Sequence, residues 1–210
     1  MKKLSNTKKF IYLISPDSIS NIKEFFKDLE LVFKTKKIFF FQLRLKKENK
    51  GRIIDIGKKI KKMCKKYKVN FIINDSPNFT KIIDADGCHL GQKDTDIIKA
   101  KKILKKKIIG ITCHNSKKLI YKAIKNKADY IAIGAFFKSF TKNTDYKATI
   151  SLLKFVKKIT KIPIVAIGGI NNRNYKKLLL NKANFLAISG YIWNNIKYKP
   201  SEAIKKLNEN

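Results

Sequence analysis

Short apolar runs alternate with amphipathic, lysine-rich stretches along the whole chain. The apolar runs are rich in Ile, Val and Phe, and they predict buried strands at Phe10–Ile14, Ile38–Leu45, Asn70–Ile73, Gly87–Leu90, Ile108–Thr112, Tyr130–Gly134, Ile164–Ile167 and Phe185–Ser189. The stretches between them have a helical period, and one of them, Ile53–Tyr67, places Ile56 and Ile60 on the same face. Near-continuous apolar strands that alternate with helices indicate a parallel sheet covered on its outer side.

Eight such strands in a chain of 210 residues predict an α/β fold, a (β/α)8 or TIM barrel, with residues 1–210 forming a single domain. A doubly wound open sheet shows the same alternation. However, the first strand is followed at residues 15–17 by Ser-Pro-Asp and not by a Gly-x-Gly-x-x-Gly turn. Asp94, Ser116 and Pro200 stand at expected helix starts. The chemistry of such a barrel lies at the carboxyl ends of its strands.

Polar residues follow the second, third and fourth predicted strands. Period-2 alternation sends Gln42, Arg44 and Lys46 to one face, where they suit an anion, while the intervening leucines face the other side. Asp75 and Asp94 follow the next two strands, and two carboxylates on neighbouring loops suit Mg²⁺, which commonly takes its other ligands from substrate phosphates and water. The alternatives are a lysine-rich surface strand for the first group and helix caps for the carboxylates.

The later strand ends carry hydroxyls, lysines and glycines, which suit a second anion. Ser139, Thr141 and Lys142 lie in the loop after the sixth strand, and glycines 168–169 and Ser189 end the seventh and eighth strands. Glycines there let backbone N–H groups approach a phosphate, which is a recurring site of these barrels. The pattern predicts two anion sites with a metal between them, as in a two-substrate transfer enzyme that releases pyrophosphate.

The histidines and cysteines add no further chemistry at this stage. His89 and His114 show no metal-ligand spacing, and we interpret both as structural. Cys113 has no evident base beside it and is not assigned as a nucleophile. The three cysteines include no Cys-x-x-Cys pair, so neither a disulfide framework nor a zinc site is indicated.

The formal net charge of +34 permits nucleic-acid or membrane binding but does not favour it. Of the 49 basic residues, only Arg44, Arg52 and Arg173 are arginines, whereas base recognition and bidentate phosphate contacts favour arginine. A lysine-rich solvated surface explains the charge. No apolar run reaches the roughly 18 residues of a membrane span, and the polar start does not resemble a signal peptide. We therefore expect a cytoplasmic protein with small-molecule partners, no membrane and no specific nucleic acid.

Together and in order, these motifs closely resemble the thiamine phosphate synthase family. The resemblance runs from about Phe40 to Trp193, and it rests on Gln-x-Arg-x-Lys, Asn-Asp, Asp-Gly-Cys-His-Leu-Gly-Gln-Lys-Asp, the Ser-Phe-Thr-Lys loop and Val-Ala-Ile-Gly-Gly-Ile. It implies a Mg²⁺-dependent transferase of thiamine biosynthesis, which joins hydroxymethylpyrimidine diphosphate to thiazole phosphate. The products would be thiamine phosphate and pyrophosphate. The implied reaction is dissociative, with no covalent enzyme intermediate.

The resemblance also implies a role for each candidate residue. The residues that would bind the pyrimidine diphosphate are Gln42, Arg44, Lys46, Asn74 and Thr112. Those that would seat the thiazole phosphate are Ser139, Thr141, Gly168, Gly169, Ile188 and Ser189. Asp75 and Asp94 would hold Mg²⁺. Lys142, with Arg44 and Lys46, would stabilise the charge of the departing pyrophosphate.

Several positions depart from the pattern of the family. Ser139 stands where many members carry Thr, and Thr112 replaces a frequent Ser, so both hydroxyls remain. Leu45 replaces a frequent acidic residue. Lys147-Ala148 stands where many members have a glycine, which leaves the phosphate geometry open.

Two alternatives remain at the level of sequence. The first is a thiazole tautomerase-like paralogue, although such proteins typically carry a His where this chain has Ala135 and lack the Thr-x-Thr-Lys pattern. The second is a non-catalytic binder of phosphates or nucleic acid, for which the high lysine content is the main argument. The sequence leaves homo-oligomer formation open.

Overall fold

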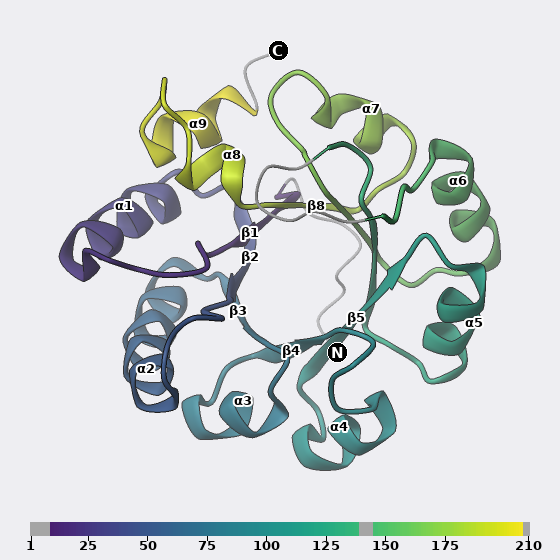
Figure 1. Ribbon diagram of the computed structural model, residues 1–210, viewed down its shortest axis with the longest axis horizontal. Coiled ribbons are helices and arrows are strands. Elements are labelled where there is room, and N and C mark those ends of the chain that lie inside the picture. Colours follow the sequence, from purple (N-terminus) through teal and green to yellow (C-terminus); the bar gives the residue numbers. More distant parts are fainter. Residues whose placement is uncertain (1–8, 139–144, 208–210) are drawn as a thin grey trace.

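The computed structural model describes residues 9–138 and 145–207, in which parallel strands form a closed ring surrounded by helices (Figure 1). The strands follow one another around the ring in chain order, and the last pairs with the first, so the sheet has no free edge. Their bounds are β1 Ile11–Ile14, β2 Ile38–Leu43, β3 Asn70–Asn74, β4 Gly87–Leu90, β5 Ile108–His114, β6 Tyr130–Gly134, β7 Ile164–Ile167 and β8 Phe185–Ile188. The expected (β/α)8 barrel is confirmed, and the open sheet is excluded.

Helices cover the outer face of the ring (Figure 1). Their bounds are α1 Ile22–Lys34, α2 Lys50–Tyr67, α3 Pro77–Ile83, α4 Ile97–Leu104, α5 Lys117–Lys125, α6 Ile150–Ile159, α7 Tyr175–Leu180, α8 Gly190–Trp193 and α9 Pro200–Lys206. Several begin at a polar residue whose side chain accepts a hydrogen bond from a backbone N–H of the first turn, as Asn49, Ser76 and Ser116 do. Such caps satisfy amides that the helix itself leaves without partners, and they fix where each helix starts behind the rim of the barrel.

Two apolar layers stabilise the barrel, one inside the ring and one between the ring and the helices. Phe40 belongs to the inner layer, where its ring centroid lies 5.1 Å from that of Tyr12 and 5.2 Å from that of Phe185. The next residue, Phe41, points outward and packs in the outer layer. Burial of a side chain of this size contributes about 1.5–3 kcal/mol. Because both faces of the strands are buried, the strands are almost continuously apolar in sequence.

Several strand boundaries differ from the expected ones. β2 ends at Leu43 and not at Leu45, because the backbone N–H of Arg44 donates to the Ser15 hydroxyl, 2.9 Å away, and leaves the ladder. β5 continues past Thr112 to its bulge with β6. Elsewhere, β1 begins one residue later than expected, β3 ends one residue later and β8 ends one residue earlier.

Helix starts were predicted with mixed success. Ser116 caps α5 and Pro200 opens α9, as expected. α2 begins at Lys50, three residues before Ile53, because Asn49 provides the cap. Asp94 is not the cap of α4; that cap is Asp96, and Asp94 instead accepts a hydrogen bond from within its own loop.

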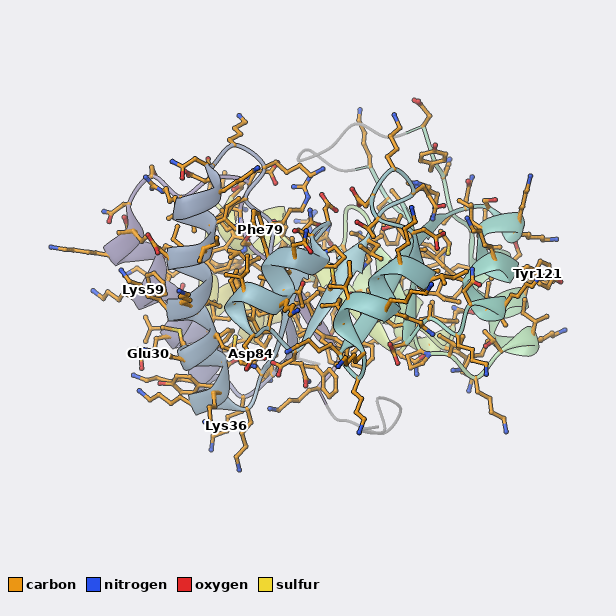
Figure 2. All side chains as sticks on the ribbon, turned by 90° about the horizontal axis from the view of Figure 1, so that it is seen from below. Glu30, Lys36, Lys59, Phe79, Asp84 and Tyr121 are labelled. Carbon is orange, nitrogen blue, oxygen red and sulfur yellow. The ribbon has the colours of Figure 1, made fainter. Side chains whose placement is uncertain are left out.

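The outer surface carries many lysine side chains that extend into solvent (Figure 2). Some are paired: on α1 and α2, Glu30 accepts hydrogen bonds from Lys66 (2.9 Å) and from the Tyr67 hydroxyl (2.6 Å). These two bonds lower the pKa of Glu30 to about 2. In the part of the chain that the structure describes, no helix has the length and apolar character needed to span a membrane.

Candidate active site

The carboxyl ends of β2 and β3 bring the first group of predicted residues together. Gln42, near the end of β2, is only 2% exposed, and its Nε2 donates to Asn74 Oδ1 at 2.7 Å. The parallel register sets this contact, because Gln42 lies beside Ile72 and therefore reaches the strand end where Asn74 stands. The bond orients two polar side chains at the mouth of the barrel, where the sequence predicts an anion site.

Arg44 is held from the loop after β1. Its guanidinium forms an ion pair with Asp17, and its backbone N–H donates to the Ser15 hydroxyl. The Arg44 side chain is 21% exposed, so one part of the guanidinium contacts Asp17 while the group still borders solvent at the mouth. Sequence reasoning missed Asp17 and Ser15, because the contact joins two loops that are far apart in the chain.

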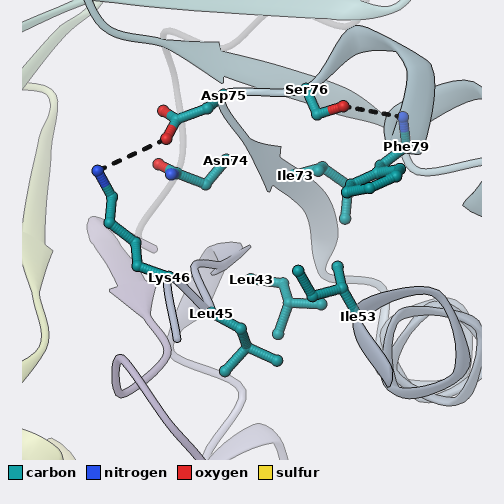
Figure 3. A pocket seen from close by; sticks show the side chains of 9 residues that line it. All are labelled: Leu43, Leu45, Lys46, Ile53, Ile73, Asn74, Asp75, Ser76 and Phe79. Carbon is teal, nitrogen blue, oxygen red and sulfur yellow. Dashed lines mark hydrogen bonds and ion pairs between the residues drawn. The ribbon is translucent and has the colours of Figure 1, made fainter. Parts of the chain in front are cut away.

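Lys46 extends across the mouth towards Asp75 (Figure 3). Its Nζ lies 3.7 Å from Asp75 Oδ2, and its side chain is half exposed. Asp75 directly follows β3 in a left-handed backbone conformation, with φ of 62°, and its N–H donates to the His89 carbonyl at 2.8 Å. The Asp75 carboxylate points towards Lys46 (Figure 3) and remains partly exposed to solvent.

Asp75 and Asp94 face each other across neighbouring loops. Burial and the neighbouring Asp94 carboxyl raise the pKa of Asp75 to about 6, against the opposing charges of Lys46 and Arg44. Asp94 is fixed in place because its Oδ2 accepts a hydrogen bond from Gly91 N at 2.6 Å. Two carboxylates that repel each other fit a divalent cation, which would relieve the repulsion.

The protein itself supplies a limited set of metal ligands. Among residues 9–138 and 145–207, no cluster of three or more His, Cys, Asp or Glu side chains could hold a metal ion. A cation at Asp75 and Asp94 would therefore complete its coordination with water or substrate oxygens, which is the usual arrangement for Mg²⁺. The donor set consists of hard oxygens and fits Mg²⁺ better than a softer metal.

Thr112 lies on β5 at the edge of the mouth and ends a chain of buried polar side chains. The Tyr12 and Tyr130 hydroxyl oxygens are 2.7 Å apart, and the Tyr130 hydroxyl lies 2.9 Å from His89 Nδ1. His89 Nε2 lies 2.8 Å from Thr112 Oγ1. Burial lowers the pKa of His89 to about 4, so the imidazole is neutral at physiological pH. Gly110 makes room for this chain, since a Cβ there would lie 1.8 Å from the Tyr130 ring.

His89 was interpreted as structural from sequence, and the two tyrosines were not singled out. The available signal was the presence of Tyr12 and Tyr130 within otherwise apolar strands, because a buried hydroxyl nearly always has a hydrogen-bond partner. The sequence could not indicate that the partners lie on β1, β4, β5 and β6, since strand alternation fixes the face but not the height of each side chain.

The structure describes only part of the second predicted anion site. Ser139, Thr141 and Lys142 lie outside the described residues. Gly168 and Gly169 both have positive φ values, 105° and 61°. A Cβ on Gly168 would lie 2.3 Å from the Ala135 Cβ, and one on Gly169 would lie 2.3 Å from the Lys138 carbonyl. The glycines are therefore required by close packing of the segment after β6, whether or not they also contact phosphate.

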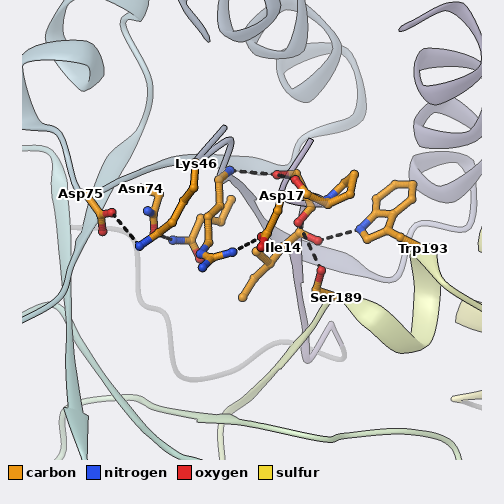
Figure 4. A network of polar contacts seen from close by, with 11 residues as sticks. Ile14, Asp17, Lys46, Asn74, Asp75, Ser189 and Trp193 are labelled. Atoms are coloured by element: carbon orange, nitrogen blue, oxygen red, sulfur yellow. Dashed lines mark hydrogen bonds and ion pairs between the residues drawn. The ribbon is translucent and has the colours of Figure 1, made fainter. Parts of the chain in front are cut away.

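The end of β8 joins this region to the loop after β1 (Figure 4). Ser189 Oγ donates to the Ser15 carbonyl at 3.2 Å, and Trp193 Nε1 donates to the Ile14 carbonyl at 2.7 Å. The Ile188 side chain is buried in the outer apolar layer, so only its main chain is available to a ligand at the mouth. Ser15 thus contacts both Arg44 and Ser189, and it connects the two predicted anion sites.

A cavity of about 340 Å³ opens beside the Lys46–Asp75 pair (Figure 3). Its lining residues are Leu43, Leu45, Lys46, Ile53, Ile73, Asn74, Asp75, Ser76 and Phe79. The apolar part of this lining comes from the ends of β2 and β3 and the starts of α2 and α3, and the polar part is shared with the mouth. The cavity is thus a side extension of the candidate site.

Comparison with known proteins identifies similar sequences. Residues 11–192 match the family described as thiamine monophosphate synthase. A thiamine-phosphate synthase of Pelagibacter ubique is 64% identical, over 99% of this chain and the full length of the relative. A thiamine-phosphate synthase of Nitrosomonas eutropha is 38% identical, over 85% of this chain and 84% of the relative.

Solved structures with the same architecture are also similar. Thiamine phosphate pyrophosphorylase from Pyrococcus furiosus superposes with a TM-score of 0.83 at 25% identity, covering 94% of this chain and 93% of that one. A 3-hexulose-6-phosphate synthase superposes with a TM-score of 0.69 at 12% identity, covering 94% and 98%. The second similarity shows the barrel fold alone, since the same barrel serves many reactions.

Proposed function

The chain belongs to the thiamine monophosphate synthase family, and from this premise we propose that the mouth of its barrel condenses hydroxymethylpyrimidine diphosphate with thiazole phosphate. The protein is a transferase of thiamine biosynthesis. The observation that carries the finer proposal is the convergence of Gln42, Asn74, Lys46 and Asp75 at one end of the barrel. These groups come from separate strand ends, and together they offer hydrogen-bond donors and positive charge beside a carboxylate pair.

The first step of the proposed reaction is departure of pyrophosphate. The bond between the pyrimidine methylene carbon and the diphosphate oxygen breaks, and the oxygen keeps the electron pair. Arg44 and Lys46 would bind the pyrophosphate oxygens, with Gln42 and Asn74 as neutral partners. Charge on the leaving group grows as the bond breaks, so cations positioned at its oxygens stabilise the transition state more than the substrate.

Asp75 and Asp94 would hold Mg²⁺ against the same pyrophosphate. The two carboxylates, one with a raised pKa, suit a hard divalent cation that shares its coordination with phosphate oxygens. When bound, Mg²⁺ supplies neutralisation of the leaving-group charge. Lys46 Nζ lies 3.7 Å from Asp75 Oδ2, and we expect it to contact the same pyrophosphate oxygens.

The second step joins the two rings. The thiazole nitrogen donates its lone pair to the pyrimidine methylene carbon, so the new C–N bond replaces the broken C–O bond. Thr112 would contact the pyrimidine throughout. Lys142 would stabilise the negative charge of the pyrophosphate that departed in the first step. The groups that would seat the thiazole phosphate are Ser139, Thr141, Gly168, Gly169, Ile188 and Ser189. The protein contributes positioning and charge stabilisation, with no covalent intermediate.

The cellular setting follows from the same proposal. We infer one catalytic domain, a cytoplasmic location and small-molecule partners, with no membrane and no specific nucleic acid. The lysine-rich surface would attract both anionic substrates and would not serve to recognise nucleic acid.

Release of pyrophosphate from the purified protein tests the proposal. We expect release only when both substrates and Mg²⁺ are present. Asp75→Ala and Lys46→Ala should each abolish most of the activity without unfolding the protein, because both side chains border solvent. Lys107→Ala is the matched control, since it removes an ion pair with Asp84 away from the mouth and should leave the rate unchanged. Near-normal rates in the first two variants would remove these residues from the mechanism.

A further inference from the structure

The polar chain inside the barrel links buried strands to the candidate site. It comprises Tyr12 on β1, Tyr130 on β6, His89 on β4 and Thr112 on β5, with consecutive polar atoms 2.7, 2.9 and 2.8 Å apart. Apolar side chains of the inner layer surround the tyrosines. A chain of this kind can donate in either of two directions, and the direction decides what Thr112 offers to a ligand.

In the outward direction, each group donates to the next from Tyr12 towards Thr112, and every buried proton has an acceptor. The Tyr12 hydroxyl donates to the Tyr130 oxygen, and the Tyr130 hydroxyl donates to His89 Nδ1. His89 is then protonated on Nε2, which donates to Thr112 Oγ1. Thr112 is half-buried, and its own hydroxyl proton is then free to point into the mouth.

In the inward direction, one buried proton has no acceptor. Thr112 would donate to Nε2, His89 would donate through Nδ1 to Tyr130, and Tyr130 would donate to Tyr12. Among the described residues, Tyr12 has no second hydrogen-bond partner to receive its own proton, and it is 1% exposed. A buried unsatisfied donor costs about 1–3 kcal/mol, so the outward direction is favoured.

We propose that Tyr130 and His89 are positioning residues that fix the Thr112 hydroxyl as a neutral hydrogen-bond donor towards the pyrimidine substrate. This inference rests on the proposed function and deepens it. A donor is the complement of a lone pair, such as that of a pyrimidine ring nitrogen. A neutral donor also keeps positive charge away from the methylene carbon, where positive charge develops as pyrophosphate leaves.

The protonation pattern of His89 tests the direction without any turnover. Nitrogen-15 NMR of histidine-labelled protein near neutral pH distinguishes the two neutral tautomers and the charged imidazolium. His89→Gln identifies which histidine resonance belongs to this residue. We expect a neutral ring protonated on Nε2. A neutral ring protonated on Nδ1, or a charged ring, would overturn the proposal.

Two substitutions of His89 separate its two contacts. Asn places an amide near the position of Nδ1 and can keep the Tyr130 contact, whereas Gln reaches the position of Nε2 and can keep the Thr112 contact. We expect His89→Asn to lower kcat/KM for the pyrimidine substrate about tenfold, which is the loss of roughly one hydrogen bond. His89→Gln should retain most of the wild-type value. Equal losses in both variants would contradict a role through Thr112.

A double-mutant cycle separates positioning from a structural effect. Thr112→Val keeps the shape of the side chain and removes the hydroxyl. In that background, His89→Asn should cause no further loss of kcat/KM, because the hydroxyl that His89 orients is gone. Additive losses would mean that His89 acts otherwise, and they would refute the proposal.

A control variant accounts for general destabilisation. Tyr67→Phe removes a tyrosine hydrogen bond of similar length, to Glu30 on the outer surface, and should leave kcat/KM unchanged. Thermal unfolding of every variant is measured alongside activity. If the wild-type protein released no pyrophosphate at all, the proposed function would fail, while the tautomer measurement would still decide the direction of the chain.

Discussion

Asp75 combines several constraints at the scale of a single residue. It directly follows β3 with a left-handed backbone, contacts Lys46 through its carboxylate and has a pKa of about 6. That pKa lies above the ordinary aspartate value, so the folded, metal-free protein binds a proton that the unfolded chain has already released. The stability that the folded protein gains from binding this proton is therefore present at low pH and is lost as the pH rises through about 6.

This proton should compete with Mg²⁺. Metal binding requires the ionised carboxylate, so it releases a proton below about pH 6 and none well above it. We expect Mg²⁺ to raise the melting temperature more at about pH 8 than at about pH 5, as thermal unfolding can measure. Asp75→Asn should show little Mg²⁺ response at either pH. An equal response of the wild-type protein at both values would contradict this assignment.

Single residues could be predicted from sequence where their neighbours on the strand revealed them. Gln42 and Asp75 were proposed as site residues because polar residues at or just after the end of an apolar strand are conspicuous, whereas Asn74 was proposed only through the family resemblance. Asp17 was not predicted, because its role is to form an ion pair with Arg44, and only the folded ring brings these two residues together. The roles given to Ser139, Thr141 and Lys142 rest on sequence alone, and they stay predictions.

At the scale of elements, β5 and β6 pack through a glycine that faces a tyrosine. Gly110 lies beside Tyr130 in the ladder, and a Cβ at Gly110 would lie 1.8 Å from the tyrosine ring. We expect Gly110→Ala to lower the free energy of unfolding by about 1–3 kcal/mol, as overpacking of a core does. It should also lower activity, since Tyr130 would be displaced from His89. Urea denaturation and the pyrophosphate assay measure the two effects.

A second glycine provides the comparison for that variant. Gly51 lies in the first turn of α2, where an added Cβ would meet only Asn49 Oδ1 at 3.5 Å. Gly51→Ala should therefore leave stability unchanged or raise it slightly, because alanine favours the helix. If Gly110→Ala were as stable as Gly51→Ala, the close packing between β5 and β6 would not be a constraint.

Element type was predictable, whereas element ends were less so. Apolar runs identified every strand because burial on both faces leaves a strong signal in sequence. The observed strand ends differ from the predicted ones where a side chain forms a hydrogen bond with a backbone group. At the end of β2, for example, the Ser15 hydroxyl accepts a hydrogen bond from the Arg44 amide. Such hydrogen bonds depend on loops from other parts of the chain, which a periodic pattern does not contain.

At the scale of the whole molecule, closure of the ring creates the candidate site. The pairing of β1 with β8 brings Ser15 against Ser189, residues 174 positions apart in the chain. The sequence predicted the barrel from its number of strands, and that prediction placed all the polar strand ends at one mouth. It could not predict the depth of each group or the contacts between them, since these follow from the stagger of the strands.

The net charge of +34 acts on the whole molecule as well. Lysines distributed over the surface produce a positive field that attracts anionic substrates to the mouth. The same positive charges repel one another, and this repulsion destabilises the folded protein. Added salt screens both effects, since the Debye length falls from roughly 10 Å at about 0.1 M to about 3 Å at 1 M. We expect moderate KCl to raise the KM of the pyrimidine diphosphate severalfold, with little change in kcat, and to raise the melting temperature. Steady-state kinetics across a KCl series, with Mg²⁺ held saturating, checks the first effect, and thermal unfolding checks the second. A KM independent of salt would mean that substrate capture depends only on the groups at the mouth and not on the surrounding lysines.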